Sequence, residues 1–134
     1  MLDPNRAKGG FADLVGYDLV RWDPDGVAVT LTVAEQHQNR SGAMHGGVLT
    51  TLIDTACGYA GCYAPPGAEG RRAFTLSLNT HFIFAAQKGM VLTATARQTG
   101  GGRSIFFATC EVTNQDGKVI GRGEGTFKYI QLRR

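Results

Sequence analysis

Residues 44–61, MHGGVLTTLIDTACGYAG, form a long apolar stretch whose only acidic or basic side chain besides His45 is Asp54. Gly46 and Gly47 stand at its beginning and prolines follow beyond its end, which predicts one helix between them. Bulky apolar residues cover one broad side of this helix, and small residues surround Asp54 on the other. A helix this apolar is normally buried, and a curved sheet wrapped around it would provide the cover.

Asp54 has no basic residue near it in the sequence, because no lysine or arginine occurs between Arg40 and Arg71. Burying an unpaired carboxylate costs on the order of several kcal/mol, so packing alone rarely retains one. One interpretation is an ion pair with an arginine from elsewhere, or a cap on a loop. We favour a cleft in which low polarity strengthens the base and small residues keep the floor open, namely Thr50, Thr51, Cys57 and Gly58.

His45, Gly46 and Gly47 lie where the helix begins, and the first N–H groups of a helix have no partner within it. Glycine lets a ligand atom approach these groups closely, so they could hold a developing oxyanion. A simple turn into the helix is the alternative. His45 and Asp54 are about 13.5 Å apart along a helix, so they cannot easily meet on one substrate atom within one chain. A second copy packed antiparallel could bring one chain's Gly46 opposite the other's Asp54.

Alternating apolar residues predict five strands around the helix, at 27–36, 74–84, 90–98, 104–113 and 118–130. A turn at 22–26 (WDPDG) precedes the first strand, and turn residues at 88–89, 100–102 and 115–117 (QDG) separate the last four. The last four strands are consecutive and joined by tight turns, which indicates an antiparallel sheet. A short helix is expected within 4–15. The predicted fold class is α+β, with one domain over 1–134 and a flexible segment at 1–10.

The composition, with 43% hydrophobic and 19% charged residues, is that of a globular protein. A net charge of +3 is too weak to indicate a nucleic-acid partner. No apolar run reaches the roughly 18 residues that a membrane span needs. The N-terminal MLDPNRAKGGFADL also lacks the apolar core of a secretory signal. Three cysteines without metal-ligand spacing fit reduced thiols, so we expect a cytoplasmic protein without a metal site.

Residues 39–47, NRSGAMHGG, followed by Asp54, resemble the PaaI-like acyl-CoA thioesterases of the hotdog fold. The order of elements is similar too, with a long helix after the first strand and an antiparallel sheet of five to six strands wrapped around it. The resemblance implies hydrolysis of an acyl-CoA thioester at a dimer interface. It also implies a homo-oligomer, more often a tetramer built as a dimer of dimers, with no metal or redox cofactor.

The resemblance also implies roles by position. Asp54 matches the acidic residue that acts as nucleophile or general base, and Gly46 matches the glycine whose N–H polarises the thioester carbonyl. His45 and Asn39 match residues beside the thioester and the attacking water. Thr75 falls where relatives carry a serine or threonine that orients this water. The expected substrate contacts come from the helix and from a turn near the CoA phosphates, namely Gly47, Thr51, Gly58, Arg103 and Ser104.

Other residues have a plainer interpretation beside the functional one. Gly121, Gly123 and Gly125 share one face of a strand, where they would let the helix pack closely or, less favoured, admit an acyl-pantetheine arm. The phenylalanines at 82, 84, 106 and 107 and the side chain of Tyr63 are expected in the core, although Tyr59 or Tyr63 could also line an acyl pocket. Weaker candidates for phosphate contacts are the side chains of Arg71, Arg72 and Lys128.

Two other functions on the same fold remain open. A non-catalytic acyl-CoA sensor typically carries a DNA-binding segment, and the residues before Phe11 are too few for one; the retained Asp54 also argues for chemistry. An enoyl-CoA hydratase or dehydratase would need a His–Asp or His–Glu pair. The sequence His45-Gly46-Gly47 at the start of the helix weighs against this function. The acyl group is not specified, although small residues around Asp54 suggest room for a bulky or aromatic group. The family resemblance suggests an arylacetyl or hydroxyaryl group.

Overall fold

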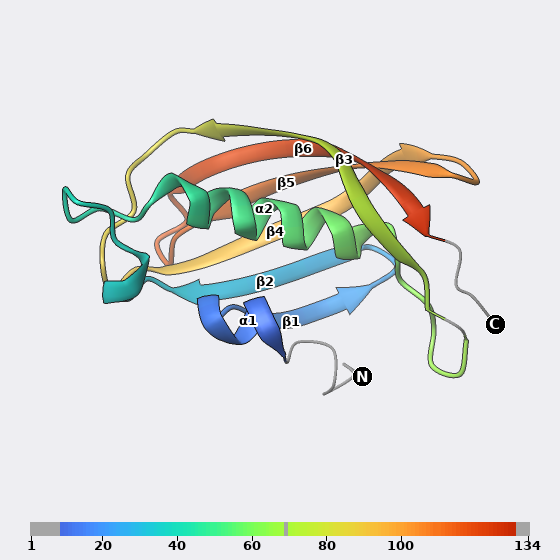
Figure 1. Cartoon of the computed structure of the whole chain (residues 1–134), viewed down its shortest axis with the longest axis horizontal. Coiled ribbons are helices and arrows are strands. Elements are labelled where there is room, and N and C mark those ends of the chain that lie inside the picture. The colour runs from blue at the N-terminus through green and yellow to red at the C-terminus, as the bar shows by residue number, and fades with distance from the viewer. Residues whose placement is uncertain (1–8, 69, 131–134) are drawn as a thin grey trace.

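The computed structural model describes residues 9–68 and 70–130 of the chain. Its helices and strands, in chain order, are α1 (Gly10–Val15), β1 (Asp18–Asp23), β2 (Gly26–Thr32), the 3₁₀ helix η1 (Glu35–His37), α2 (Gly46–Ala60), β3 (Arg72–Phe82), β4 (Val91–Gly101), β5 (Ile105–Thr113) and β6 (Val119–Ile130). The strands form one antiparallel sheet in the order β1-β2-β4-β5-β6-β3. Figure 1 shows this sheet curving around α2, so the predicted α+β architecture is confirmed. The predicted flexible segment falls mostly outside the described residues.

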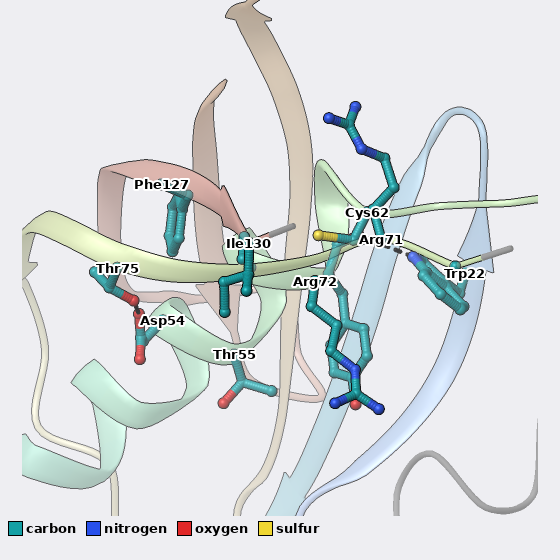
Figure 2. A pocket seen from close by; sticks show the side chains of 13 residues that line it. Trp22, Asp54, Thr55, Cys62, Arg71, Arg72, Thr75, Phe127 and Ile130 are labelled. Atoms are coloured by element: carbon teal, nitrogen blue, oxygen red, sulfur yellow. Dashed lines mark hydrogen bonds between the residues drawn. The ribbon is translucent and has the colours of Figure 1, made fainter. Parts of the chain in front are cut away.

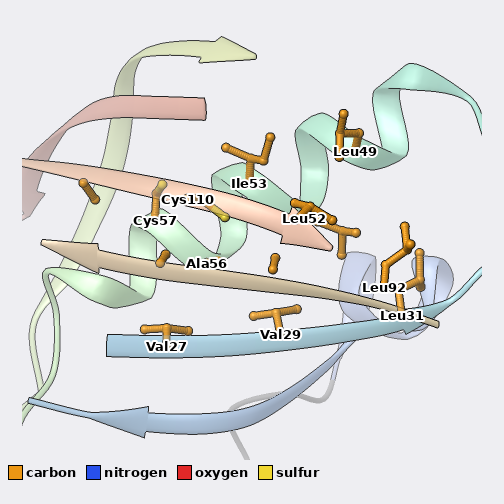
Figure 3. Close-up of a cluster of buried hydrophobic side chains, with 14 of the residues drawn as sticks. Val27, Val29, Leu31, Leu49, Leu52, Ile53, Ala56, Cys57, Leu92 and Cys110 are labelled. Atoms are coloured by element: carbon orange, nitrogen blue, oxygen red, sulfur yellow. The ribbon is translucent and has the colours of Figure 1, made fainter. Parts of the chain in front are cut away.

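The central helix begins at Gly46 and ends at Ala60, within the limits that its flanking glycines and prolines predict. Its buried side chains include Leu49, Leu52 and Ile53, and they meet alternate residues of the sheet (Figure 3). In β2, these residues are Val27, Val29 and Leu31. Each fully buried side chain of this size contributes about 1.5–3 kcal/mol, so this layer holds the helix in place.

Close packing of α2 on β6 requires Gly121 and Gly123. A Cβ atom at Gly121 would lie 2.5 Å from Leu49 Cδ2, and one at Gly123 would lie 2.7 Å from Ile53 Cγ2. The second would also lie 2.6 Å from the backbone oxygen of Asn79 in β3. Real Cβ atoms do not come this close to other heavy atoms. The prediction that these two glycines let the helix approach the sheet is therefore confirmed.

The sequence prediction missed the first strand, β1, and assigned its end to a turn. Only Leu19 is buried in this strand, so it lacks the alternation that reveals a half-buried strand. Trp22 and Asp23 are its last residues and pair with β2. The turn is confined to Pro24 and Asp25, where Asp23 Oδ1 accepts the Asp25 N–H at 2.8 Å.

The predicted tight turn between β3 and β4 is wrong, because these strands are not neighbours. β3 is an edge strand that pairs only with β6, whereas β4 lies between β2 and β5. The connection, residues 83–90, passes the beginning of α2, where the Met44 N–H donates to the Ala86 oxygen at 2.9 Å. The Lys88-Gly89 pair marks a bend at the end of this crossover, and a bend does not determine which strands pair.

Three of the four phenylalanines expected in the core are exposed. Phe82, Phe84 and Phe107 are 63%, 43% and 47% exposed, and only Phe106 is buried. Phe82 ends the edge strand β3, which also exposes the apolar side chains of Phe74 and Leu76. A row of apolar side chains on an unpaired strand edge is typical of a surface that another chain covers.

Candidate active site

Asp54 lies in the middle of α2 and makes a short hydrogen bond with the neighbouring strand β3. The Thr75 hydroxyl donates to Asp54 Oδ1 at 2.6 Å, as Figure 2 shows. Within residues 9–68 and 70–130, Asp54 has no ion pair, so the alternative of an internal arginine partner does not hold for this part of the chain. The second carboxylate oxygen, Oδ2, makes no hydrogen bond there either and can act on a ligand.

Asp54 and Thr75 line a cavity of about 620 Å³. This volume lies in the range of small-molecule sites, which run from roughly 300 to 1,000 Å³. The cavity lies between the second half of α2, the beginning of β3 and the end of β1. Besides Asp54 and two arginines, its lining is uncharged and rich in aromatic and small residues, including Trp22, Thr55, Gly58, Tyr59, Cys62, Phe127 and Ile130.

The beginning of α2 carries a histidine that caps the helix with its own side chain. His45 Nδ1 accepts the Gly47 N–H at 2.8 Å, so in the neutral ring the proton is on Nε2. The close approach depends on Gly47, where a Cβ atom would lie 3.0 Å from His45 Nδ1. Gly46 is the first helical residue, and its N–H has no acceptor within the helix. Gly46 N–H and His45 Nε2–H are therefore the two donors that this end of the helix can present.

The loop before α2 is held by the side chain of Asn39. Its Oδ1 accepts the N–H groups of Ser41 at 2.9 Å and Ala43 at 3.2 Å. The His45 N–H donates to the His37 oxygen at 2.8 Å, which ties the end of the loop to η1. Asn39 is exposed, and because its oxygen is used inside the loop, its NH₂ group is the part that it offers to a ligand.

Within the described chain, the predicted catalytic residues fall into two separate groups. Asn39 and Gly46 line a second cavity of about 290 Å³, together with Phe82. None of the residues around this cavity also lines the cavity of Asp54 and Thr75. One chain therefore presents the carboxylate in one place and the candidate oxyanion donors in another, in line with the helical spacing of His45 and Asp54.

The predicted substrate contacts divide in the same way. Gly58 lines the Asp54 cavity, whereas the Thr51 hydroxyl donates to the Gly47 oxygen at 2.8 Å, one turn back along the helix. Arg103 and Ser104 are exposed in the turn between β4 and β5 and line neither of these cavities. These positions suit contacts with the parts of a ligand that lie outside a cavity.

The sequence analysis placed Cys57 on the open floor of the cleft beside Asp54, and this prediction is wrong. Cys57 is fully buried, and Figure 3 shows it on the side of the helix that faces the sheet. A side-chain hydrogen bond with Cys57, followed by burial, raises the pKa of the Cys110 thiol well above its usual range. Cys110 is therefore a neutral thiol, and neither of these cysteines lines the Asp54 cavity.

Sequence reasoning missed two of the aromatic side chains in the cavity, Trp22 and Phe127. Trp22 was assigned to a turn, yet its Nε1–H donates to the Tyr59 oxygen at 2.9 Å and fixes the indole against the end of α2. Tyr59, an expected candidate for an acyl pocket, does line the cavity. Phe127 is buried and also lines the cavity, and nothing local in the sequence indicated that its ring faces a ligand site.

Within residues 9–68 and 70–130, no three His, Cys, Asp or Glu side chains lie together in a way that could hold a metal ion. No helix in the same ranges is long and apolar enough to cross a membrane.

Comparison with known proteins gives the family. The model of the thioesterase superfamily matches residues 41–120, which include His45, Asp54 and Thr75. Mouse acyl-coenzyme A thioesterase 13 is 31% identical over 109 residues, which cover 81% of this chain and 76% of the mouse protein. Acyl-coenzyme A thioesterase PaaI of Escherichia coli is 32% identical over 109 residues, which cover 81% of this chain and 74% of that protein.

Solved structures agree with this comparison. The E. coli PaaI structure superposes with a TM-score of 0.80 at 30% identity, covering 90% of this chain and 83% of that chain. A hypothetical thioesterase of Streptococcus pneumoniae, determined with coenzyme A, gives a TM-score of 0.76 at 25% identity, covering 88% of this chain and 91% of that chain. The helix wrapped by an antiparallel sheet is thus the hotdog fold of these proteins. The chain belongs to the thioesterase superfamily, as a PaaI-like member.

Proposed function

We propose that the protein is an acyl-CoA thioesterase that hydrolyses a thioester to a free carboxylic acid and CoA. The observation that carries this proposal is Asp54, which lies in a ligand-sized cavity with a hydroxyl partner and no counter-ion in the described chain. A thioester is activated enough for one base and one oxyanion site to suffice. The names of the mouse and E. coli relatives and the CoA-bound S. pneumoniae structure support the choice of substrate.

In the proposed reaction, Gly46 N–H and His45 Nε2–H hold the thioester oxygen as it gains negative charge. Asp54 can attack the carbonyl carbon itself, which expels the CoA thiolate and leaves a mixed anhydride that water then hydrolyses. Alternatively, Asp54 removes a proton from water, whose oxygen attacks the carbonyl, and the proton goes on to the thiolate. Thr75 orients the carboxylate in both routes, and the Asn39 amide is available to a water beside the thioester.

A second copy of the chain would complete this site. The unpaired edge of β3 exposes Phe74, Leu76 and Phe82, and two such edges related by a two-fold axis would pair antiparallel. The α2 helices would then also run antiparallel, which would bring Gly46 of one copy toward Asp54 of the other. Two such dimers in a tetramer correspond to the assembly that the family resemblance implies.

The remaining predicted contacts would hold the rest of the substrate. Arg103 and Ser104, exposed in the β4–β5 turn, suit the phosphates of CoA, because guanidinium groups bind phosphate oxygens through charge-assisted hydrogen bonds. Gly47, Thr51 and Gly58 would contact the substrate along α2. No cofactor beyond the CoA of the substrate is required in this scheme.

The test is a thiol-release assay with short, medium, long and aromatic acyl-CoAs. The wild-type protein is expected to release CoA, and Asp54→Ala is expected to lower kcat by about two or more orders of magnitude. Asp116→Ala, in the exposed β5–β6 turn, is a matched control that also removes one carboxylate. Equal rates for wild type and Asp54→Ala would end the proposed role of Asp54. Binding of acyl-CoA without hydrolysis would indicate a sensor, and addition of water to an enoyl-CoA would indicate a hydratase.

A further inference from the structure

The cavity that contains Asp54 also contains two cations. Of the described residues that line it, Asp54 is the only acidic one, and Arg71 and Arg72 are the only basic ones. Neither arginine forms an ion pair with Asp54. The cavity therefore combines a carboxylate with positive charge that does not neutralise it, so the positive charge is available to a ligand.

Arg71 is already engaged by the protein. Its guanidinium lies over the ring of Tyr129, 3.3 Å from the centroid, and donates to the Arg103 oxygen at 3.3 Å. Such stacking fixes the planar group and satisfies part of its donor set. The role of Arg71 is thus to hold the beginning of β3 against β6 and the β4–β5 turn.

The guanidinium of Arg72, unlike that of Arg71, is not held by contacts with other described residues. Within residues 9–68 and 70–130 its side chain makes no hydrogen bond, ion pair or ring contact, and Figure 2 shows its guanidinium pointing away from that of Arg71. A guanidinium has five N–H donors in a planar fork that matches a carboxylate. Arg72 therefore offers the cavity a set of donors that no other described residue uses.

The remaining lining of the cavity indicates which kind of ligand segment it suits. Trp22, Tyr59 and Phe127 supply aromatic walls, which suit a hydrocarbon or aryl segment. We propose that Arg72 binds a carboxylate at the far end of the acyl group, so that the substrates are thioesters of dicarboxylic acids. This inference rests on the proposed thioesterase function and names the substrate class for the same site.

Phosphates of CoA are a poorer match for Arg72. Both Arg72 and Arg103 are exposed, but Arg72 lines the Asp54 cavity and Arg103 does not. The phosphates are the most hydrophilic part of the substrate and belong outside the cavity, where Arg103 lies. Arg72 shares a cavity with the carboxylate that attacks the thioester, and the aromatic walls that it also shares would not suit a nucleotide diphosphate. The two arginines would thus bind opposite ends of one substrate.

The experiment compares pairs of acyl-CoAs of equal chain length, one ending in a carboxylate and the other in its methyl ester, over several lengths. The measured quantity is the ratio of kcat/KM within each pair. Wild type is expected to favour the carboxylate at one length, and Arg72→Gln is expected to lower that ratio by about tenfold or more, the effect of losing one charge-assisted contact. Arg72→Lys is expected to retain part of the ratio. Arg97→Gln, which removes an arginine outside the cavity, is the matched control.

The same pairs, made as N-acetylcysteamine thioesters without a nucleotide, separate the two ends of the substrate. An Arg72→Gln effect that persists in these short thioesters supports recognition of the acyl end. An effect that is equal for both members of each pair and disappears without the nucleotide assigns Arg72 to the CoA phosphates and overturns the inference. A wild-type ratio near one also overturns it, while hydrolysis of the neutral esters would leave the thioesterase proposal standing. Failure to hydrolyse any thioester would instead refute the proposed function.

Discussion

At the scale of single residues, the active site depends on how Asp54 is held. One oxygen accepts the Thr75 hydroxyl and the other stays open to the cavity, so the hydrogen bond orients the carboxylate without neutralising it. An isolated charge on a central helix is costly unless it is hydrogen-bonded. Thr75 thus makes the position tolerable for folding and suitable for chemistry at the same time.

Replacing Thr75 by valine is expected to separate these two effects. Valine keeps the shape but removes the donor, so kcat is expected to fall about tenfold to a hundredfold, the effect of one hydrogen bond to a charged group. Thr75→Ser keeps the hydroxyl and is expected to restore most of the rate. Steady-state kinetics on the best acyl-CoA will distinguish them. If the serine variant were as slow as the valine variant, the methyl group and not the hydrogen bond would matter.

Sequence reasoning selected Asp54 from physics, and it selected Thr75, as a residue that orients water, only through the resemblance to known thioesterases. It did not predict the hydrogen bond between them. A carboxylate in an apolar helix is a local conflict that is visible without a structure. The aromatic walls were not visible, because Trp22 is 32 residues from Asp54 and reaches the cavity only through the pairing of β1 with β2. Contacts of this kind depend on the register of strands, which residue patterns do not report.

At the scale of elements, the distance between α2 and the sheet is set by glycines in β6. Gly123→Ala is expected to lower the free energy of unfolding by about 1–3 kcal/mol, because the new Cβ would meet Ile53 and a backbone oxygen of β3. Gly102→Ala is the control, since nothing lies within 4 Å of a Cβ there. Urea denaturation of the two variants measures the difference. Equal midpoints would mean that the helix and the sheet can move slightly apart without lowering the free energy of unfolding.

The elements themselves were predictable to different degrees. The helix from Gly46 to Ala60 was clear, because glycines and prolines mark its limits and a wide apolar side predicts its burial. The position of β3 at an edge was not, because turn residues show where the chain bends and not which strand it meets. Phe82, at the end of this edge strand, is exposed although its apolar character indicates burial. In the proposed dimer, a second chain would cover it.

At the scale of the whole molecule, the separation of Asp54 from Asn39 and Gly46 predicts complementation between inactive chains. Asn39→Asp keeps the oxygen that holds the loop and removes the NH₂ group, and Asp54→Ala removes the carboxylate. In a mixed dimer, one of the two shared sites would contain neither change. Coexpressed chains with two tags, purified through both, are therefore expected to recover about a quarter to a half of wild-type activity.

The thiol-release assay on the mixed dimer decides this question. Each variant alone would carry its defect in both sites and stay impaired. A mixed dimer as inactive as its parents would show that each site lies within one chain, and the shared-site arrangement would have to be abandoned. A tetramer would give the same result in kind, because it contains the same pairs.

If the proposed dimer forms through β3, the open edge of this strand would also affect the protein before two chains have met. A newly made chain displays unsatisfied backbone groups beside several phenylalanines, which is the arrangement that promotes off-pathway aggregation. Association with an identical chain therefore competes with association with any other chain that exposes an unpaired apolar strand. The yield on refolding should therefore fall when unrelated unfolded protein is present. It should rise with the concentration of the chain itself, because identical chains then associate faster.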